Sequence, residues 1–391
     1  MAWLMYQLDI QTPTETDPWA GVDFCKRFQS LCQRKARRVA YIYETPDTST
    51  FRYRCWNMAE TLNQYSQDVS AGCFYLSEFE RAEEIVNNAD VLVICRVRWD
   101  HRINHFVTQA RTKGRLLLYD IDDMVFDPSI IPVVMESLQV DLTEDNLNFW
   151  FAYAARLQTT LSFCDGYITT NPFLASILRT SLPNGREAIV PNFLNKSQMD
   201  ISKLAMEHKT RNNFQRDDNI HIGYFSGTPT HARDLAIAEQ GLAQILEDEP
   251  AARLHLVGFI EPQGPLRAFT DRIDRCGLTN FRNLQLLLAR TEINIAPLNE
   301  NLFTNCKSEL KWFEAAVAGS ITIASPTFPF RNAIKDGYNG FLAPVGSWYS
   351  KLKTAIEQVG EIDFIRCAAS DAESRYSWEL MSAKIETAIF G

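Results

Sequence analysis

The sequence has few of the features that mark several common classes of protein. Its 391 residues include only six histidines, and none of its nine cysteines forms a CxxC pair. A dispersed, odd-numbered set of cysteines is typical of reduced thiols rather than of a disulfide framework or a zinc site. GxSxG, HExxH and P-loop motifs are also absent, so nothing favours a serine hydrolase, a zinc protease or a P-loop NTPase.

Long apolar runs are missing too. The longest candidates, such as Val91–Cys95, fall far short of the ~18 residues that a membrane-spanning helix needs. The first residues lack the charged start and continuous apolar stretch of a secretory signal, so we expect a cytoplasmic protein. The formal net charge of −9, from 39 basic and 48 acidic residues, argues against nucleic acid as a partner, although it allows a local basic patch.

Apolar runs of β-rich composition alternate with stretches of helical period, which predicts an α/β fold with doubly wound parallel sheets. One series fills residues 38–195 and a second fills 220–370, with a polar linker at 196–219. Strands are predicted at 38–44, 89–95, 115–121, 166–170 and 187–190, and again at 220–225, 253–258, 293–296 and 320–324. Two such domains enclose a cleft, and ligands of open α/β sheets bind beyond the carboxyl ends of the strands.

Residues 1–37 form an N-terminal extension that ends in a basic segment. Lys26–Arg38 contains six lysines and arginines, with Phe28 and Leu31 among them. A basic amphipathic helix of this kind can contact an anionic membrane surface or a partner. The alternative is a helix that packs on the first domain and leaves its charges in water.

The turn after the strand at 220–225 is a candidate phosphate cradle. It holds the small residues Gly227, Thr228 and Thr230, with His231 beside them, and a helix follows. Small residues let the backbone approach a phosphate, and the start of a helix offers unpaired N–H groups. An ordinary strand-to-helix turn would show the same pattern.

A second candidate is the segment at 303–319, for which we predict a helix from about residue 308 to residue 318. If the segment is helical from its start, Lys307, Lys311 and Glu314 share one side at i, i+4 and i+7 spacing. Two cations could then hold a diphosphate, and the carboxylate could accept both hydroxyls of a ribose. A solvent-facing stripe with ion pairs at helical spacing is the alternative.

Three carboxylates follow the strand at 115–121, namely Asp120, Asp122 and Asp123. Like charges packed this closely repel one another, which favours a functional role. A carboxylate here could orient an acceptor hydroxyl in the cleft. Alternatively, the DxD pair resembles the haloacid dehalogenase superfamily, in which Asp120 would be the nucleophile and Asp120 and Asp122 would hold magnesium. Met124 departs from that pattern, since the superfamily usually has Thr or Val there.

The second half of the chain resembles the retaining nucleotide-sugar glycosyltransferases of group 1, also called family 4. The pieces that carry the resemblance keep the family order along roughly residues 220–391. They are Ile222–Thr228, Leu254–Gly258, Ile295–Leu298, Lys307–Lys311 with Ser308, Glu314–Gly319, Ile321–Ser325, Ile334–Leu342 and Tyr376–Glu379. In the first half, Arg52–Arg54 and Tyr119–Asp123 are similar to a branch of bacterial polysaccharide glycosyltransferases.

This resemblance implies the two-domain GT-B fold, with residues 371–391 crossing back to the first domain. It also implies transfer of a sugar from a UDP-, GDP- or dTDP-sugar to a glycan or glycoconjugate hydroxyl, with no requirement for a divalent metal. Glu314 would bind the donor ribose, while Lys307, Lys311 and the turn from Gly227 to His231 would hold the diphosphate. Asp122 or Asp123 would orient the acceptor, and Asp120 is the other match for the catalytic position of this strand end.

One departure from the family pattern affects the donor site. The family often has a second Glu eight positions before the one at 314, and here that position is Cys306. Asn305, Lys307, Lys311 or His231 would have to take over its contacts with the donor sugar. A pair of domains that binds a glycan or a partner without catalysis therefore remains an alternative.

Overall fold

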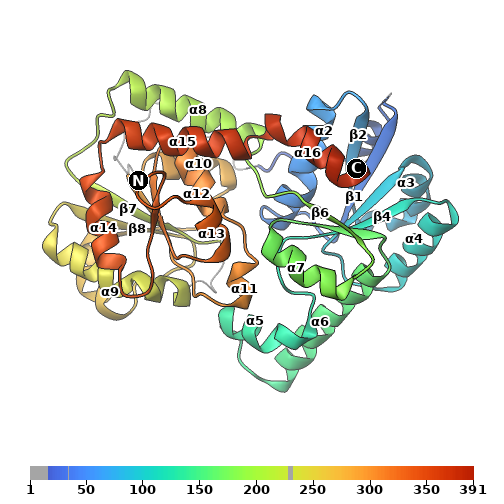
Figure 1. The fold of residues 1–391 in the computed structure, drawn as a ribbon, viewed down its shortest axis with the longest axis horizontal. Coiled ribbons are helices and arrows are strands. Elements are labelled where there is room, and N and C mark those ends of the chain that lie inside the picture. Colours follow the sequence, from blue (N-terminus) through green and yellow to red (C-terminus); the bar gives the residue numbers. More distant parts are fainter. Residues whose placement is uncertain (1–15, 34, 228–231) are drawn as a thin grey trace.

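The computed structural model describes residues 16–33, 35–227 and 232–391, and these form two α/β domains (Figure 1). Each domain is built on a six-stranded parallel sheet within these residues. Buried strands such as β3 (Val91–Cys95) and β10 (Ile293–Ala296) are apolar almost throughout, as expected for parallel sheets covered by helices on both faces.

The first domain has the strand order β2-β1-β3-β4-β5-β6. Its other strands are β1 (Arg37–Tyr43), β2 (Val69–Tyr75), β4 (Leu116–Ile121), β5 (Gly166–Thr169) and β6 (Arg186–Ile189). Its helices are α1 (Phe24–Leu31), α2 (Asn57–Tyr65), α3 (Ala82–Asn88), α4 (His101–Thr112), α5 (Ile131–Ser137), α6 (Glu144–Ser162) and α7 (Pro172–Ser181). Short 3₁₀ turns lie at Leu76–Arg81 and Pro128–Ile130, and a π-helical turn, Arg52–Trp56, leads into α2.

The second domain has the strand order β12-β11-β10-β7-β8-β9. The remaining strands are β7 (Ile220–Phe225), β8 (Ala252–Val257), β9 (Ile273–Cys276), β11 (Ile321–Ala324) and β12 (Phe341–Leu342). The helices are α8 (Lys196–Arg211), α9 (Ala232–Asp248), α10 (Phe281–Ala289), α11 (Leu302–Asn305), α12 (Leu310–Val317), α13 (Phe328–Ala333), α14 (Trp348–Glu357) and α15 (Ile362–Tyr376), and the last helix, α16 (Trp378–Phe390), lies on the first domain. A 3₁₀ stretch, Gly264–Arg272, precedes β9.

The predicted strands match the structure to within two residues at each end, but three edge strands, β2, β9 and β12, were not predicted. The segment 196–219, which was predicted to be a linker, differs more from the structure. Its residues 196–211 form α8, which begins with a capping box from Asn195 to Gln198 and packs on α10 and α12. The buried side chains of α8 include the polar residues Gln198, Ser202 and Lys209. Because polar residues occupy these core positions, the segment lacks the apolar periodicity by which a helix is predicted.

The basic segment near the N-terminus is largely committed to the fold. Arg27 in α1 is buried and donates to both carboxylate oxygens of Glu78 and to the carbonyl of Cys73. Lys35 Nζ donates to the carbonyls of Asn63 and Ser66 at 3.0 and 2.9 Å. Among the described residues, no helix combines the length and apolar character needed to cross a membrane.

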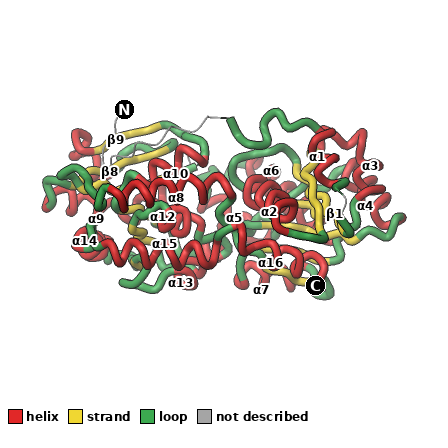
Figure 2. Tube along the Cα trace, turned by 90° about the horizontal axis from the view of Figure 1, so that it is seen from above, coloured by secondary structure: helices red, strands yellow, loops and turns green. Residues whose placement is uncertain are grey.

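The two domains are tied together by the C-terminal helices. Helix α15 runs along the second domain and α16 along the first, as Figure 2 shows from above. Helix α16 packs on α2, and the rings of Tyr65 and Trp378 meet edge-on with centroids 4.8 Å apart. At the crossing, the ring of Tyr376 stacks on Phe313 with centroids 4.6 Å apart. One hydrophobic cluster therefore continues from the first domain into the second.

A buried ion pair anchors the π-helical turn to the first sheet. Arg54 Nε and Nη2 donate to the two carboxylate oxygens of Asp120 in β4 at 2.7 and 2.9 Å, and neither side chain is exposed. Nη1 of Arg54 also donates to the carbonyl of Val190 at 2.7 Å. Burial raises the pKa of Asp120 to about 6 although the arginine opposes the shift. Breaking such a pair from one side leaves an uncompensated charge in the core.

We therefore expect Arg54→Met to lower the free energy of unfolding by about 3–5 kcal/mol at pH 7. Because the folded-state pKa of Asp120 lies above its unfolded value, the folded protein holds the extra proton at low pH and must lose it as pH rises. The deficit of the variant should therefore be smaller at pH 5 than at pH 7. Urea unfolding at both pH values measures it, with Arg54→Met/Asp120→Asn as the control that removes the buried charge. Equal deficits at the two pH values would contradict this account.

Candidate active site between the domains

A cavity of about 290 Å³ lies between the carboxyl ends of the two sheets. The first domain contributes the loop after β1, the π-helical turn, Asp122 and Asn192. The second contributes the ends of β7 and β8 and parts of α10 and α12. This position agrees with the general rule that open α/β sheets bind ligands beyond the carboxyl ends of their strands.

Lys311 gives the cavity its positive charge. It lies in the first turn of α12, and its Nζ is buried without a hydrogen-bond partner among the described residues. Burial lowers the pKa of Lys311 to about 8, and the carboxylate of Asp234 opposes the shift. The ring of Tyr224 lies 4.9 Å from the ammonium group. A buried ammonium is costly unless hydrogen bonds or a counter-charge satisfy it, so the site is suited to an anion.

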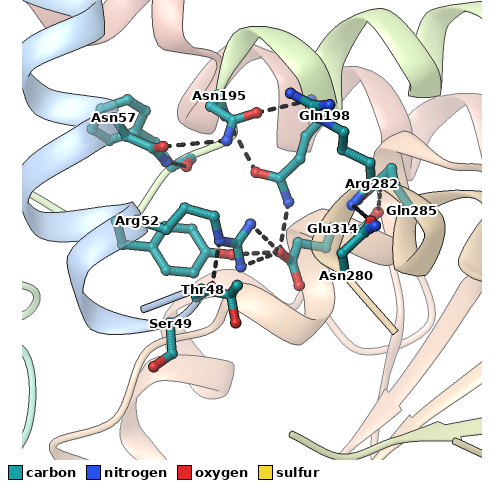
Figure 3. A network of polar contacts seen from close by, with 12 residues as sticks. Thr48, Ser49, Arg52, Asn57, Asn195, Gln198, Asn280, Arg282, Gln285 and Glu314 are labelled. Atoms are coloured by element: carbon teal, nitrogen blue, oxygen red, sulfur yellow. Dashed lines mark hydrogen bonds and ion pairs between the residues drawn. The ribbon is translucent and has the colours of Figure 1, made fainter. Parts of the chain in front are cut away.

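Glu314 lies one turn further along α12, and its side chain is buried at the domain boundary. Its Oε1 accepts hydrogen bonds from the hydroxyl of Tyr53 and from Gln198 Nε2, the latter at 2.7 Å, as Figure 3 shows around Gln198 and Arg52. Both terminal nitrogens of Arg52 lie 3.5 Å from the same oxygen. Oε2 makes no hydrogen bond with the described residues, and Glu314 lines the cavity.

The loop and turn that form the first-domain wall are held by Asp47. Its Oδ1 accepts from the backbone N–H groups of Ser49 and Phe51 at 2.8 and 3.1 Å, and Tyr43 donates to Oδ2 at 2.6 Å. The helical segment that follows widens into a π-helical turn, a rare geometry that is frequent at functional sites. It directs Arg52 toward the cavity.

An apolar wall of the cavity lies beside Arg52. Phe281, Leu284 and Leu288 from α10, together with Leu278 before it, line this side. The guanidinium of Arg52 lies over the ring of Phe281, 4.7 Å from its centroid. A flat apolar wall beside polar groups is the surface that a nucleobase would need.

The three acidic candidates of the first domain have separate environments. Asp120 is wholly enclosed with Arg54 and offers no surface to the cavity. Asp122 lines the cavity and accepts from Thr50 Oγ1 at 3.1 Å and from Arg96 at 3.4 Å. Asp123 lies 3.4 Å from Lys307 Nζ across the domain boundary. The burial of Asp120 removes the nucleophile that a haloacid dehalogenase-like reaction would use.

The segment before α12 is not one continuous helix, because α11 ends before Cys306. The Sγ of Cys306 is buried 3.7 Å from the Sδ of Met124, and Asn171 Nδ2 donates to the carbonyls of Cys306 and Lys307 at 3.1 and 2.9 Å. Lys307 therefore does not share a stripe with Lys311 and Glu314, contrary to the arrangement expected for a continuous helix.

The remaining candidate residues differ in whether they line the cavity and whether their polar atoms already have hydrogen-bond partners. Gly227 lines the cavity, and a Cβ added there would meet no atom within 4 Å, so a ligand could approach its backbone. Ser308 Oγ is buried without a partner, whereas Asn305 Oδ1 accepts from the N–H of Phe328 at 2.8 Å. Thr228, Thr230 and His231 lie outside the described residues. Within the described part of the chain, no cluster of three or more His, Cys, Asp or Glu side chains could hold a metal ion.

Sequence reasoning assigned no role to three residues at the site. Tyr53 was noticed only as part of a family-like segment, and Gln198 lies in the stretch interpreted as a linker. Arg96 follows β3 with a φ of 49°, a left-handed conformation that is uncommon for a residue with a side chain. Its position at the end of an apolar strand is the only sequence signal that could have indicated a role for Arg96, because a left-handed loop conformation cannot be recognised from amino-acid composition.

Comparisons with known proteins agree with this geometry. Residues 220–361 match the family model described as glycosyl transferases group 1, and no curated protein sequence matches the chain. A glycosyltransferase from Rickettsia africae has a similar structure, with a TM-score of 0.60 at 10% identity over 91% of this chain and 99% of that one. Sucrose-phosphate synthase from Thermosynechococcus elongatus has a TM-score of 0.58 at 15% identity, covering 89% and 97%.

HepE from Anabaena, solved in complex with UDP and glucose, has a TM-score of 0.56 at 14% identity over 89% of this chain and 98% of that one. Identities this low establish the fold alone. The family match covers the second domain, which carries Lys311 and Glu314. The second domain thus matches the family model of group 1 glycosyltransferases, and the chain as a whole has the GT-B fold.

Proposed function

We propose that this protein transfers a sugar from a nucleoside-diphosphate sugar to a hydroxyl of a glycan or glycoconjugate, with retention at the anomeric carbon. The observation that carries the proposal is the buried ammonium of Lys311, which has no hydrogen-bond partner among the described residues and lies beside Glu314 in a cavity shared by both domains. A diphosphate would satisfy the ammonium, and ribose hydroxyls would satisfy the open Oε2 of Glu314.

The donor would lie with its base against the wall of Phe281 and Leu284 and with its diphosphate between Lys311 and Gly227. UDP is the first nucleotide to test, because HepE from Anabaena was solved with UDP and glucose. In the reaction, the bond from the anomeric carbon to the diphosphate oxygen breaks and a bond to the acceptor oxygen forms on the same face. The acceptor proton passes to the departing diphosphate, so no protein nucleophile takes part.

Charge stabilisation is the main catalytic work in this scheme. Negative charge grows on the diphosphate as the glycosidic bond breaks, and Lys311 is already held there with no hydrogen bond to the described residues. Preorganised charge in a water-poor site is worth more than the same charge in water. Asp122, held by Thr50 and Arg96, lies on the first-domain side and would orient the acceptor hydroxyl. The scheme requires no divalent metal, and polysaccharide assembly is the process it fits.

The membrane contact considered for the basic segment receives little support from the side chains themselves. Arg27 and Lys35 hold parts of the first domain together, so their charges are not presented to a surface. Any contact with anionic lipid would depend on Lys26, Arg37 and Arg38.

The roles of Glu314 and Lys311 can be separated by mutation. Glu314→Ala should raise the Kd of the bound nucleoside diphosphate about tenfold or more, because hydrogen bonds to a charged group contribute ~1.5–3 kcal/mol. Lys311→Ala should lower kcat by ~10²–10³, a loss typical of removing one group that stabilises developing charge. Calorimetry with UDP, GDP and dTDP and a transfer assay with the corresponding sugar donors measure the two effects.

Exposed residues away from the cavity provide the controls, Glu357→Ala in α14 and Lys384→Ala in α16. Unchanged affinity and turnover in both site variants would refute the assignment. Nucleotide binding by the unmodified protein without transfer to any glycan acceptor would instead favour the non-catalytic binding protein.

The pH dependence of nucleotide binding tests the charge of Lys311. The free protein loses the Lys311 proton near pH 8, so the Kd of the nucleoside diphosphate should be constant from pH 7 to 7.5 and rise above pH 8, approaching tenfold per pH unit. Lys311→Arg keeps its proton throughout this range, so its Kd should stay level up to pH 9.5. Calorimetric titrations at half-unit steps measure both. A similar rise in the arginine variant would assign the titration to another group.

A further inference from the structure

Glu314 is held by groups from both domains, although a ribose-binding carboxylate needs only the second domain. The hydroxyl of Tyr53, from the first domain, donates to Oε1, and Gln198 Nε2 donates to the same oxygen at 2.7 Å (Figure 3). Tyr53 is 2% exposed and Glu314 is 3% exposed. A buried hydrogen bond to a charged acceptor fixes the acceptor strongly, so the rotamer of Glu314 is set from across the domain boundary.

The donor hydroxyl is rigidly attached to the first domain. Tyr53 lies in the π-helical turn between Arg52 and Arg54, and the bidentate pair of Arg54 with Asp120 fastens that turn to β4. The ring of Tyr53 also carries the guanidinium of Arg52, whose carbon lies 4.1 Å from the ring centroid. A shift of the first domain would therefore carry the Tyr53 hydroxyl away from Glu314.

Helix α8 completes the arrangement by holding α12 near its middle and just beyond its C-terminal end. Gln198 in its first turn contacts the carboxylate of Glu314. Lys209 in its last turn donates to the carbonyls of Ala318 and Gly319, just beyond α12, at 2.7 and 3.1 Å. Helix α12 is thus fixed, and the remaining freedom at this point lies in the contact with the first domain.

We propose that Tyr53 is a positioning residue through which the first domain completes the donor-nucleotide site. Its hydroxyl holds Oε1 of Glu314 so that Oε2 is presented to the ribose, and nucleotide binding and domain closure thereby stabilise each other. The inference rests on the proposed function, and it adds a residue on the acceptor side of the molecule to the donor site. A purely structural tyrosine would affect stability without affecting nucleotide affinity.

The test is a double-mutant cycle on the binding of UDP, or of GDP or dTDP if one of these binds more tightly. Tyr53→Phe removes only the hydroxyl and should raise Kd about five- to tenfold. In a Glu314→Ala background the same change should raise Kd less than twofold, because the acceptor it acts through is gone. Tyr65→Phe, at the other end of the same helical segment, is the matched control and should change Kd less than twofold.

Two further measurements separate positioning from folding. Tyr53→Phe should raise the KM for the sugar donor by the same five- to tenfold and leave kcat within twofold. Small-angle scattering should give the nucleotide-free variant a larger radius of gyration than the unmodified protein. If Tyr53→Phe does not fold, Gln198→Met removes the neighbouring hydrogen bond to the same oxygen and should weaken UDP binding similarly.

The outcomes distinguish a failure of the proposed function from a failure of the role inferred for Tyr53. If the unmodified protein binds none of the three nucleotides, the proposed function fails and this inference fails with it. If it binds one of them and Tyr53→Phe binds equally well, or if the two substitutions are additive, only the inference is overturned.

Discussion

A single carboxylate oxygen, Oε1 of Glu314, accepts hydrogen bonds from both domains. It accepts from Tyr53 on one side and from Gln198 on the other, with Arg52 at the edge of the same group. A buried carboxylate is tolerated only when its charge is met by donors, so the protein can bury Glu314 only with the domains in this arrangement. The geometry of the cavity follows from that requirement.

The two walls of the cavity differ in how fully their polar side chains are hydrogen-bonded. In the first domain nearly every polar side chain near the cavity already has a partner, as Asp122 has with Thr50 and Arg96. In the second domain the buried Nζ of Lys311 has no hydrogen-bond partner among the described residues. Native proteins satisfy almost all such atoms, so the exceptions indicate where a ligand belongs. The second-domain side of the cavity is thus the side left incomplete by the fold.

The fold and the charged helix of the donor site could be predicted because both depend on local pattern. Apolar runs identified most strands. Lys311 and Glu314 lie one turn apart, as their spacing predicted, because α12 is a regular helix. Lys307 was misplaced because the contact of Cys306 with Met124 ends α11 early, and that contact joins residues 182 positions apart. Helix α8 was missed for a related reason, since Gln198 and Lys209 are core residues only through partners that periodicity does not consider.

Tyr53 could not have been assigned a role from sequence, because its role depends on the π-helical turn that contains it. Such a turn closes hydrogen bonds over five residues instead of four and so accommodates one residue more than an α-helix of the same span. Deleting one residue within Arg52–Trp56 would permit a more regular helix. It would also rotate the preceding side chains by roughly 100° relative to those that follow. The helix register of this segment, and with it the length of the chain at this point, is therefore constrained by the site and not by helix stability.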